Sequence, residues 1–123
     1  MARLLLAEDE EVLRMLVVDT LEDEGYEIDE ASDGQEAYHL ICEKDYDLII
    51  LDFMMPGMTG LEVIEKIRTM PSKQEVKVMM LSAKNQKSDQ EQVLNAGANY
   101  FISKPFSPLE LVKRVEEILS EGK

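Results

Sequence analysis

Two apolar runs in this sequence end in carboxylates, and these are the first side chains that suggest chemistry. Residues 4–7 are followed by Glu8 and Asp9, and residues 48–51 are followed by Asp52. If the three acids meet in the fold, two unit charges about 4 Å apart repel by about 4 kcal/mol at an effective dielectric of about 20. A hard divalent cation relieves this repulsion, and Mg²⁺ prefers oxygen ligands from one or two carboxylates and water. The pattern therefore predicts a Mg²⁺ site.

Two further apolar runs lead to a hydroxyl and an ammonium. Ser82 follows residues 76–81, and Lys104 comes shortly after residues 100–102. A carboxylate beside a metal can act as a nucleophile toward a phosphoryl group, as aspartyl-phosphate chemistry requires. Such a transfer depends on positioning and on neutralising the equatorial oxygens. Ser82 and Lys104 could each hold one of those oxygens, so the run ends supply every group that this chemistry needs.

Each of these residues alone also has an ordinary explanation. Glu8 and Asp9 could favour a helix dipole, and Asp52 could simply begin a loop. Ser82 could be a strand-end hydroxyl and Lys104 a surface lysine. These explanations are largely independent of one another, whereas the chemical interpretation requires all five positions together. We therefore favour the chemical interpretation.

The elements that must position these residues alternate along the chain. Short apolar runs are typical of buried parallel strands, and the more polar segment 26–31 is typical of an edge strand. Helical patterns lie between the strands, at 11–24, 34–44, 60–70, 86–96 and from Pro108 onward. Five alternations predict an α/β fold with one parallel sheet and helices on both faces. The common five-stranded order, 2-1-3-4-5, makes the first and third strands neighbours, and ligands bind beyond the carboxyl ends where the order reverses.

Helix boundaries carry their own signals. Gly25 is placed to end the first helix, and Thr59 is a candidate N-cap for the third. Ser107, with Pro108 after it and Glu110 at the third helical position, is typical of a capping box at the start of the last helix. The apolar face expected for the first helix consists of Val12, Leu13, Leu16, Val17 and Leu21.

Length and charge limit the possible function. The 123 residues suit one domain spanning 1–123, and no apolar run approaches the roughly 18 residues that cross a bilayer. The net charge is −13, and residues 1–36 hold half of the 26 acidic residues. This charge argues against direct nucleic acid binding and against membrane association, and favours divalent cations or a basic protein partner, although solubility alone could explain most of it. The single cysteine, Cys42, suits a reducing compartment, so we expect a cytoplasmic protein.

On these residues the chain resembles the response-regulator receiver family of two-component systems, from Leu4 to about Leu119. The resemblance rests on four motifs in the right order and at the right spacing. They are Glu8-Asp9, Asp52 at the start of DFMMPGMTG, Ser82-Ala83 and Lys104-Pro105-Phe106. Each motif alone would be weak, but together they are highly specific. The resemblance implies a flavodoxin-like receiver fold.

The resemblance also assigns roles within the site. Asp52 would be the phosphoacceptor, and Mg²⁺ would be bound by Asp9, Asp52 and the carbonyl of Met54, with Glu8 assisting. Ser82, Lys104 and the backbone amides of Met54 and Ala83 would contact the phosphoryl oxygens. The Lys104–Pro105 peptide bond would be cis, which is essentially a proline phenomenon.

A conformational switch is implied as well. Phe101 matches the aromatic residue of the family that is coupled to the hydroxyl of Ser82. Core packing is the ordinary explanation for this ring, and both roles can hold for a buried ring with two rotamers. Met54 and Lys84 occupy variable positions, two residues after Asp52 and Ser82, and we predict that they slow hydrolysis of the phosphoryl group by crowding the attacking water.

The partners follow from the resemblance. A sensor histidine kinase or phosphotransfer protein would donate the phosphoryl group. The fourth helix, fifth strand and fifth helix would then bind a downstream effector or output domain. The chain would be a signalling phosphoacceptor rather than an enzyme, and a monomer or a phosphorylation-dependent dimer. It could stand alone or form the N-terminal part of a longer regulator.

Two other classes of protein remain open on the sequence. A flavodoxin-like module would bind FMN phosphate through the loop after the first strand, but Glu8 and Asp9 there would repel it. A haloacid-type hydrolase also uses Mg²⁺ and a nucleophilic aspartate, but it would have a second aspartate where this chain has Met54.

Overall fold

Five parallel strands form one sheet in the computed structural model, which describes residues 2–83 and 86–121. The strands are β1 (Arg3–Ala7), β2 (Glu27–Ala31), β3 (Leu48–Asp52), β4 (Val78–Ser82) and β5 (Tyr100–Ser103). They lie in the order β2-β1-β3-β4-β5, and every neighbouring pair is parallel. The predicted fold class and strand order are confirmed.

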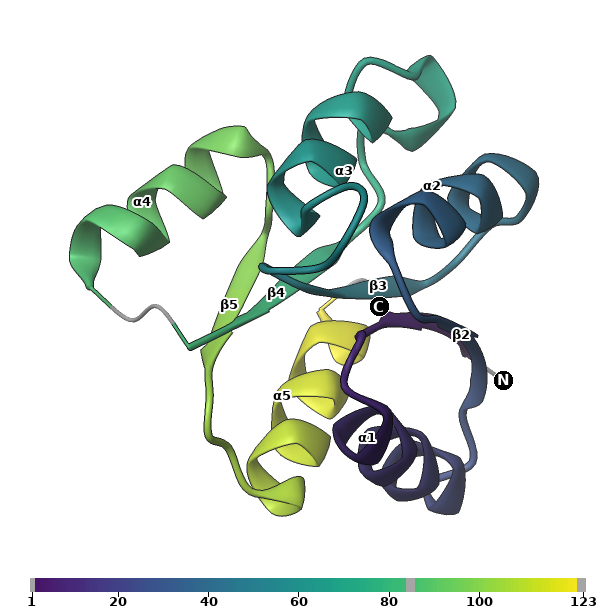
Figure 1. Ribbon diagram of the computed structural model, residues 1–123. Helices are drawn as coiled ribbons and strands as arrows, with labels where there is room; N and C mark the ends of the chain where they lie inside the picture. Colours follow the sequence, from purple (N-terminus) through teal and green to yellow (C-terminus); the bar gives the residue numbers. More distant parts are fainter. Residues whose placement is uncertain (1, 84–85, 122–123) are drawn as a thin grey trace.

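Within the described ranges, four α-helices connect the strands, a fifth follows β5, and together they cover both faces of the sheet (Figure 1). They are α1 (Glu11–Asp23), α2 (Gly34–Glu43), α3 (Gly60–Ile67), α4 (Lys87–Ala96) and α5 (Pro108–Ser120), with a 3-10 turn, η1, at Pro71–Lys73. Helices α1 and α5 lie on one face of the sheet, and α2, α3 and α4 lie on the other. Among residues 2–83 and 86–121, no helix is long and apolar enough to cross a membrane.

The three central strands are buried because both faces of the sheet are covered. All residues of β3 and β4 are buried, and Leu4, Leu5 and Leu6 of β1 have no exposed surface. Successive side chains of a strand point to opposite faces. Leu5 therefore packs with α2 and α3, whereas Leu4 and Leu6 pack with α1 and α5. Each fully buried leucine contributes about 1.5–3 kcal/mol, which explains why these strands are continuous apolar runs.

Capping boxes fix the starts of α3 and α5; the box at Ser107 and the N-cap at Thr59 were predicted, and the box at Thr59 goes beyond the prediction. The Glu62 N–H donates to Thr59 Oγ1 at 3.2 Å, and the Thr59 N–H donates to the Glu62 carboxylate at 3.1 Å. Ser107 and Glu110 make the same pair of bonds at the start of α5, at 3.1 and 3.2 Å. Such a cap contributes about 1 kcal/mol and fixes where the preceding loop must end.

The loop after β3 returns closely against the strand it leaves. The Gly60 N–H donates to the Phe53 carbonyl at 3.0 Å. A Cβ atom at Gly60 would collide with the carbonyl oxygen of Asp52 and would crowd the sulfur of Met80. Glycine is therefore required there so that α3 can start against the end of β3.

The apolar face of α1 differs from the predicted one. Val17, Val18 and Leu21 are buried, but Val12 is 82% exposed and Leu16 is 47% exposed. Helix α1 packs on the sheet beside α5, and the turn of about 100° per residue points Val12 and Leu16 away from both. The prediction is confirmed for Leu13, Val17 and Leu21 and wrong for Val12 and Leu16, because an apolar residue on a helix need not face the core.

Two element boundaries differ by two or more residues from the predicted ones. Helix α3 ends at Ile67 rather than at residue 70, because Met70 precedes Pro71 and adopts an extended backbone with φ −87° and ψ 121°. The residue before a proline is disfavoured in helical conformation. Strand β4 begins at Val78, two residues later than predicted.

Candidate functional site

The carboxyl ends of β1 and β3 lie side by side and bring the three predicted acids together. Ala7 is paired with Leu51, so Glu8 and Asp52, which come next, are neighbours. One carboxylate oxygen from each of Glu8, Asp9 and Asp52 lies within 4.8 Å of the others. The structure therefore places these acids as the strand-end argument predicted.

The three carboxylates differ in their surroundings. Glu8 has no exposed surface and Asp52 is 5% exposed, whereas Asp9 is exposed. The Glu10 N–H donates to Glu8 Oε2 at 3.1 Å. Glu8 Oε1 is buried and accepts no hydrogen bond from any described residue. This oxygen instead faces the ammonium of Lys104, so its charge is compensated by an ion pair.

Lys104 supplies the positive charge of the site from the end of β5. Its Nζ atom lies 3.0 Å from Glu8 Oε1 and 3.2 Å from Asp52 Oδ1, and its side chain is 16% exposed. The contact with Glu8 is an ion pair outside hydrogen-bond geometry. The Lys104 N–H donates to the Ser82 carbonyl at 2.8 Å, which ties β5 to β4 at the site. The Lys104–Pro105 peptide bond is cis, as predicted.

Burial controls the charges of these groups. It raises the pKa of Glu8 to about 7, and the nearby Asp52 adds to the rise. Burial also raises the pKa of Asp52, although Lys104 opposes this. Burial alone would lower the pKa of Lys104, but the two carboxylates outweigh the effect of burial. The pKa of Lys104 is therefore raised, and its ammonium stays charged. Two buried acids therefore resist ionising together, and a cation would relieve this.

Arg14 holds the backbone of the acidic loop, and the sequence reasoning missed it. Its Nη1 atom donates to the Glu8 carbonyl at 2.8 Å, and its Nε atom lies 3.4 Å from Glu30. Arg14 thus joins the end of β1 to β2. One signal could have found it, because Arg3 and Arg14 are the only basic residues among the first 36.

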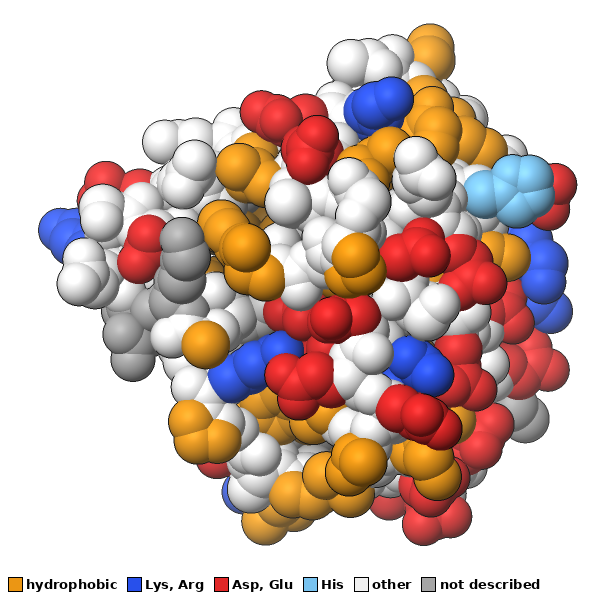
Figure 2. Space-filling model, in the orientation of Figure 1, with side chains coloured by type: hydrophobic (Ala, Val, Ile, Leu, Met, Phe, Trp, Pro, Cys, Tyr) orange, Lys and Arg blue, Asp and Glu red, His pale blue; other side chains and the backbone are white. Residues whose placement is uncertain are grey.

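These groups surround a hollow of about 300 Å³ at the carboxyl end of the sheet. It is lined by Asp9, Glu10, Asp52, Phe53, Met54, Ser82, Ala83 and Lys104. Ser82 is 1% exposed and Met54 is 57% exposed, so the hydroxyl lies deep and the methionine lies at the surface. Figure 2 shows acidic side chains gathered in the middle of this face, with basic side chains beside them.

Phe101 lies in β5 and is half-buried. It pairs with Met80 in the sheet, two residues before the pair formed by Ser82 and Ser103. Its ring packs against the core cluster formed with α2 and α3. Core packing is therefore observed, and the switching role stays a prediction. The predicted contribution of Lys84 falls on a residue outside the described ranges.

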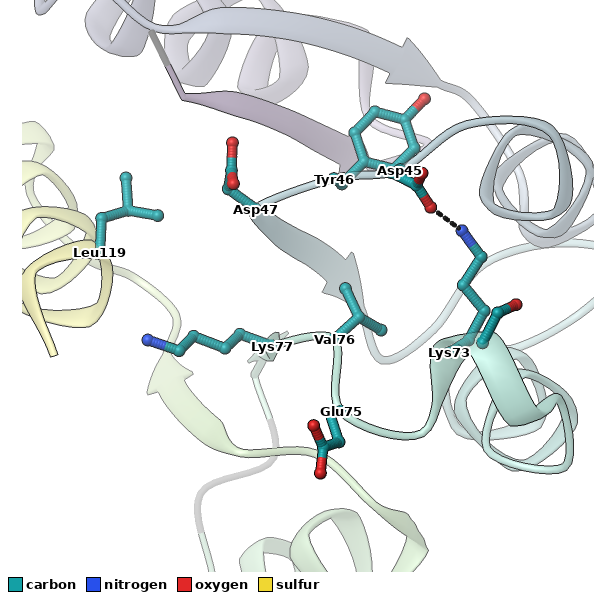
Figure 3. Close-up of a pocket in the computed structure, with 9 residues that line it drawn as sticks. Asp45, Tyr46, Asp47, Lys73, Glu75, Val76, Lys77 and Leu119 are labelled. Carbon is teal, nitrogen blue, oxygen red and sulfur yellow. Dashed lines mark hydrogen bonds and ion pairs between the residues drawn. The ribbon is translucent and has the colours of Figure 1, made fainter. Parts of the chain in front are cut away.

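A second charged hollow, of about 410 Å³, lies at the opposite end of the sheet (Figure 3). Its lysines are already bonded. Lys73 Nζ donates to the Lys44 carbonyl at 2.8 Å and lies 2.9 Å from Asp45. Lys77 Nζ donates to the Ile118 carbonyl at the end of α5, at 2.8 Å. These contacts hold loops and a helix end together, so this hollow is structural.

Comparison with known proteins agrees with the geometry of the first hollow. The family model of the response regulator receiver domain matches residues 4–116. This chain belongs to that family. Phosphoryl acceptance in two-component signalling is the general function of receiver domains, and they bind Mg²⁺ at an acidic site. The family match decides against the flavodoxin-like module and the hydrolase.

Individual relatives of this receiver domain differ in length. The transcriptional regulatory protein SrrA of Staphylococcus aureus is 41% identical over 116 residues, which cover 94% of this chain and 47% of SrrA. This receiver domain therefore spans about half the length of that relative. The chemotaxis response regulator CheY4 of Vibrio cholerae is 32% identical, with a TM-score of 0.92 over 96% of this chain and 98% of CheY4.

A third relative was solved with ligands. The response regulator protein TrrA of Thermotoga maritima, in complex with Mg²⁺-BeF, is 36% identical to this receiver domain. The TM-score is 0.84, and the likeness covers 96% of this chain and 99% of TrrA. The fold of this receiver domain is thus shared with a Mg²⁺-bound relative.

Proposed function

We propose that Asp52 accepts a phosphoryl group from a phosphohistidine on a sensor histidine kinase or phosphotransfer protein. The observation that carries the proposal is the position of Asp52. Its carboxylate lies 3.2 Å from the Lys104 ammonium, in a hollow that Ser82 also lines. A nucleophile, a cation and a hydroxyl at one site are the groups that phosphoryl transfer requires.

In this transfer an oxygen of Asp52 forms a bond to phosphorus while the bond between phosphorus and the donor imidazole nitrogen breaks. The electron pair of the broken bond stays on that nitrogen. The Lys104 ammonium and the Ser82 hydroxyl hold phosphoryl oxygens, together with the backbone amides of Met54 and Ala83. All four residues line the same hollow as Asp52. Charge that spreads over the phosphoryl oxygens would then be stabilised by these donors.

The acidic cluster fits Mg²⁺. One carboxylate oxygen from each of Glu8, Asp9 and Asp52 lies within 4.8 Å of the others, and Asp9 is open to solvent. Oxygen donors of this kind suit Mg²⁺. Asp9, Asp52 and the Met54 carbonyl would hold the ion, with Glu8 assisting. When bound, Mg²⁺ neutralises charge on the phosphoryl oxygens and relieves the repulsion between the acids.

The signal leaves through a switch and a partner face. The Ser82 hydroxyl moves toward the phosphoryl group, and Phe101, whose ring packs at the edge of the core, changes rotamer with it. Helix α4, β5 and α5 then bind a downstream effector or output domain. The chain works as a monomer or a phosphorylation-dependent dimer. It stands alone, as a chemotaxis regulator would, or forms the N-terminal part of a transcriptional regulator, as the length of SrrA suggests.

Further parts of the proposal concern the extent of the domain, its interactions and its compartment. The chain is one receiver domain spanning residues 1–123, and it is a phosphoacceptor that assists its own phosphorylation and dephosphorylation rather than an enzyme acting on other molecules. A net charge of −13 makes direct nucleic acid binding by this chain and membrane association unfavourable. The single cysteine suits a reducing compartment, so we propose that the protein is cytoplasmic.

The test is incubation with acetyl phosphate, with and without Mg²⁺, followed by intact mass. We expect one phosphate adduct that requires Mg²⁺ and is absent from Asp52→Asn. Asp47→Asn is the matched control, because Asp47 lies at the opposite end of β3 and should leave the adduct unchanged. An adduct that persists in Asp52→Asn would overturn the proposal.

A further inference from the structure

An apolar hollow opens directly beside the first hollow, the one that contains Asp52. It has a volume of about 330 Å³ and lies between the start of α1 and the loop after β5. Its lining residues are Glu10, Leu13, Ala83, Lys104, Pro105 and Phe106. Glu10, Ala83 and Lys104 also line the first hollow, so the two spaces share a wall.

The walls of the apolar hollow differ chemically from those of the first hollow. Leu13, Pro105 and Phe106 give it an apolar lining, whereas the first hollow contains Asp9 and Asp52. Leu13 and Phe106 also pack against the core cluster of α1 and α5, so the packed core holds them in place. Small-molecule sites combine such a preformed apolar lining with a few polar groups.

We propose that this apolar hollow is a subsite for the leaving group of the phosphodonor. It would favour low-molecular-weight acyl phosphates whose acyl group is flat and apolar. The inference rests on the proposed phosphorylation of Asp52 and adds a substrate preference to it. The residues that set this preference are Leu13, Pro105 and Phe106.

Lys104 connects the two spaces. Its ammonium lies 3.2 Å from Asp52 in the first hollow, while its side chain also lines the apolar hollow. A lysine of this kind can place its methylene stem along apolar surface and its charged end in a polar site. A donor with its phosphoryl group held by the ammonium would therefore have its acyl group beside the apolar wall.

The chemical step is complete without another reactant. An oxygen of Asp52 forms a bond to phosphorus, and the bond between phosphorus and the acyl oxygen breaks. The electron pair stays on that oxygen, so the leaving group departs as a carboxylate and no proton is needed. A benzene molecule fits an apolar cavity of about 150 Å³. The apolar hollow, at about 330 Å³, therefore has room for an aromatic ring.

The experiment compares benzoyl phosphate with acetyl phosphate on the full chain with Mg²⁺. The rate of Asp52 phosphorylation at low donor concentration is divided by each donor's own hydrolysis rate without protein. We expect the corrected rate to be about tenfold higher for benzoyl phosphate, the effect of burying most of one ring face. The preference should appear as a lower KM for benzoyl phosphate.

Two variants of one residue test the subsite from opposite directions. Leu13→Ala removes apolar contact and Leu13→Phe fills the space, and each should lower the ratio of benzoyl to acetyl rates by about fourfold, the effect of one methylene-sized contact. Val12→Ala is the matched control, because Val12 is the preceding residue of α1 and is 82% exposed. Its ratio should equal that of the wild type.

The outcomes separate the two proposals. Phosphorylation by both donors at equal corrected rates would overturn the subsite alone, as would a benzoyl preference that survives in both Leu13 variants. Phosphorylation of Asp52 by neither donor would overturn the proposed function and the subsite with it. Thermal melting of each variant shows that it is folded, and Phe106→Leu gives an independent change in the same wall.

Discussion

The ammonium of Lys104 lies 3.0 Å from the carboxylate of Glu8, and this contact joins the end of β5 to the end of β1 across the site. Both side chains are largely withdrawn from water, with Lys104 16% exposed and Glu8 fully buried. The same ammonium lies 3.2 Å from Asp52. One lysine therefore contacts both buried acids.

Removing that ammonium should destabilise the Mg²⁺-free protein. We expect Lys104→Met to lower the free energy of unfolding by about 1–3 kcal/mol, less than the 3–5 kcal/mol of a fully buried pair because water reaches the lysine. Added Mg²⁺ should recover part of the loss. Denaturant titration with and without Mg²⁺ measures both effects. Lys44→Met, which removes a more exposed ion pair with Asp29, should cost about 0–1 kcal/mol and should not respond to Mg²⁺.

Mg²⁺ should stabilise the wild type by mass action. At a free concentration one hundred times Kd, a ligand that binds only the folded state adds about 2.7 kcal/mol. We expect thermal melting to show this rise, and a smaller rise in Asp9→Asn, since Asp9 is an exposed member of the acidic cluster whose loss costs little packing. An equal rise in Asp9→Asn would remove Asp9 from the ion's ligands.

Met54 should control how long the phosphoryl group persists. It lines the hollow of Asp52 and is 57% exposed, so it stands where water would enter. Met54→Asn replaces an apolar side chain with one that can hold a water molecule, and we expect dephosphorylation to become severalfold faster. Loss of phosphate from the purified adduct, followed by intact mass, gives the rate. An unchanged rate would show that Met54 does not restrict water.

Much of this arrangement could be predicted because it depends on burial and strand order. The runs at 48–51 and 4–7 are apolar throughout, as is typical of strands in a sheet covered on both faces, and the order of strands then brings Glu8 beside Asp52. The capping boxes at Thr59 and Ser107 are local hydrogen-bond patterns, so sequence spacing is sufficient to find them.

What escaped prediction depends on tertiary contacts. Val12 and Leu16 have the same hydrophobicity as buried residues, and only the position of α1 beside α5 decides that they face outward. Glu8 was expected to assist at the metal site, but nothing in the sequence showed that it would be buried and paired with Lys104. Arg14 was missed because its target is a backbone carbonyl, which the sequence does not mark; only its isolation among acidic residues was visible.

Tyr46 offers a test of the fold that is independent of the site. Its hydroxyl donates to Asp29 Oδ2 at 2.7 Å, and this bond lowers the pKa of Asp29. An acid whose folded pKa is lowered contributes stability above its unfolded pKa and loses it as the pH falls through the folded value. We expect Tyr46→Phe to cost about 1 kcal/mol at pH 7 and progressively less as the pH falls through the lowered folded pKa of Asp29. Denaturant titrations at pH 7 and through the acid range measure this, and a cost that does not change with pH would contradict it.

The most direct test of the central claim locates the phosphoryl group on the chain. Borohydride reduction of the protein treated with acetyl phosphate and Mg²⁺ converts a phosphorylated aspartate to homoserine, and peptide mass spectrometry then identifies the residue. The account predicts homoserine at position 52 alone, and none when Mg²⁺ is omitted. Homoserine at position 9 in place of 52, or no converted residue in a protein that carries the adduct, would contradict it.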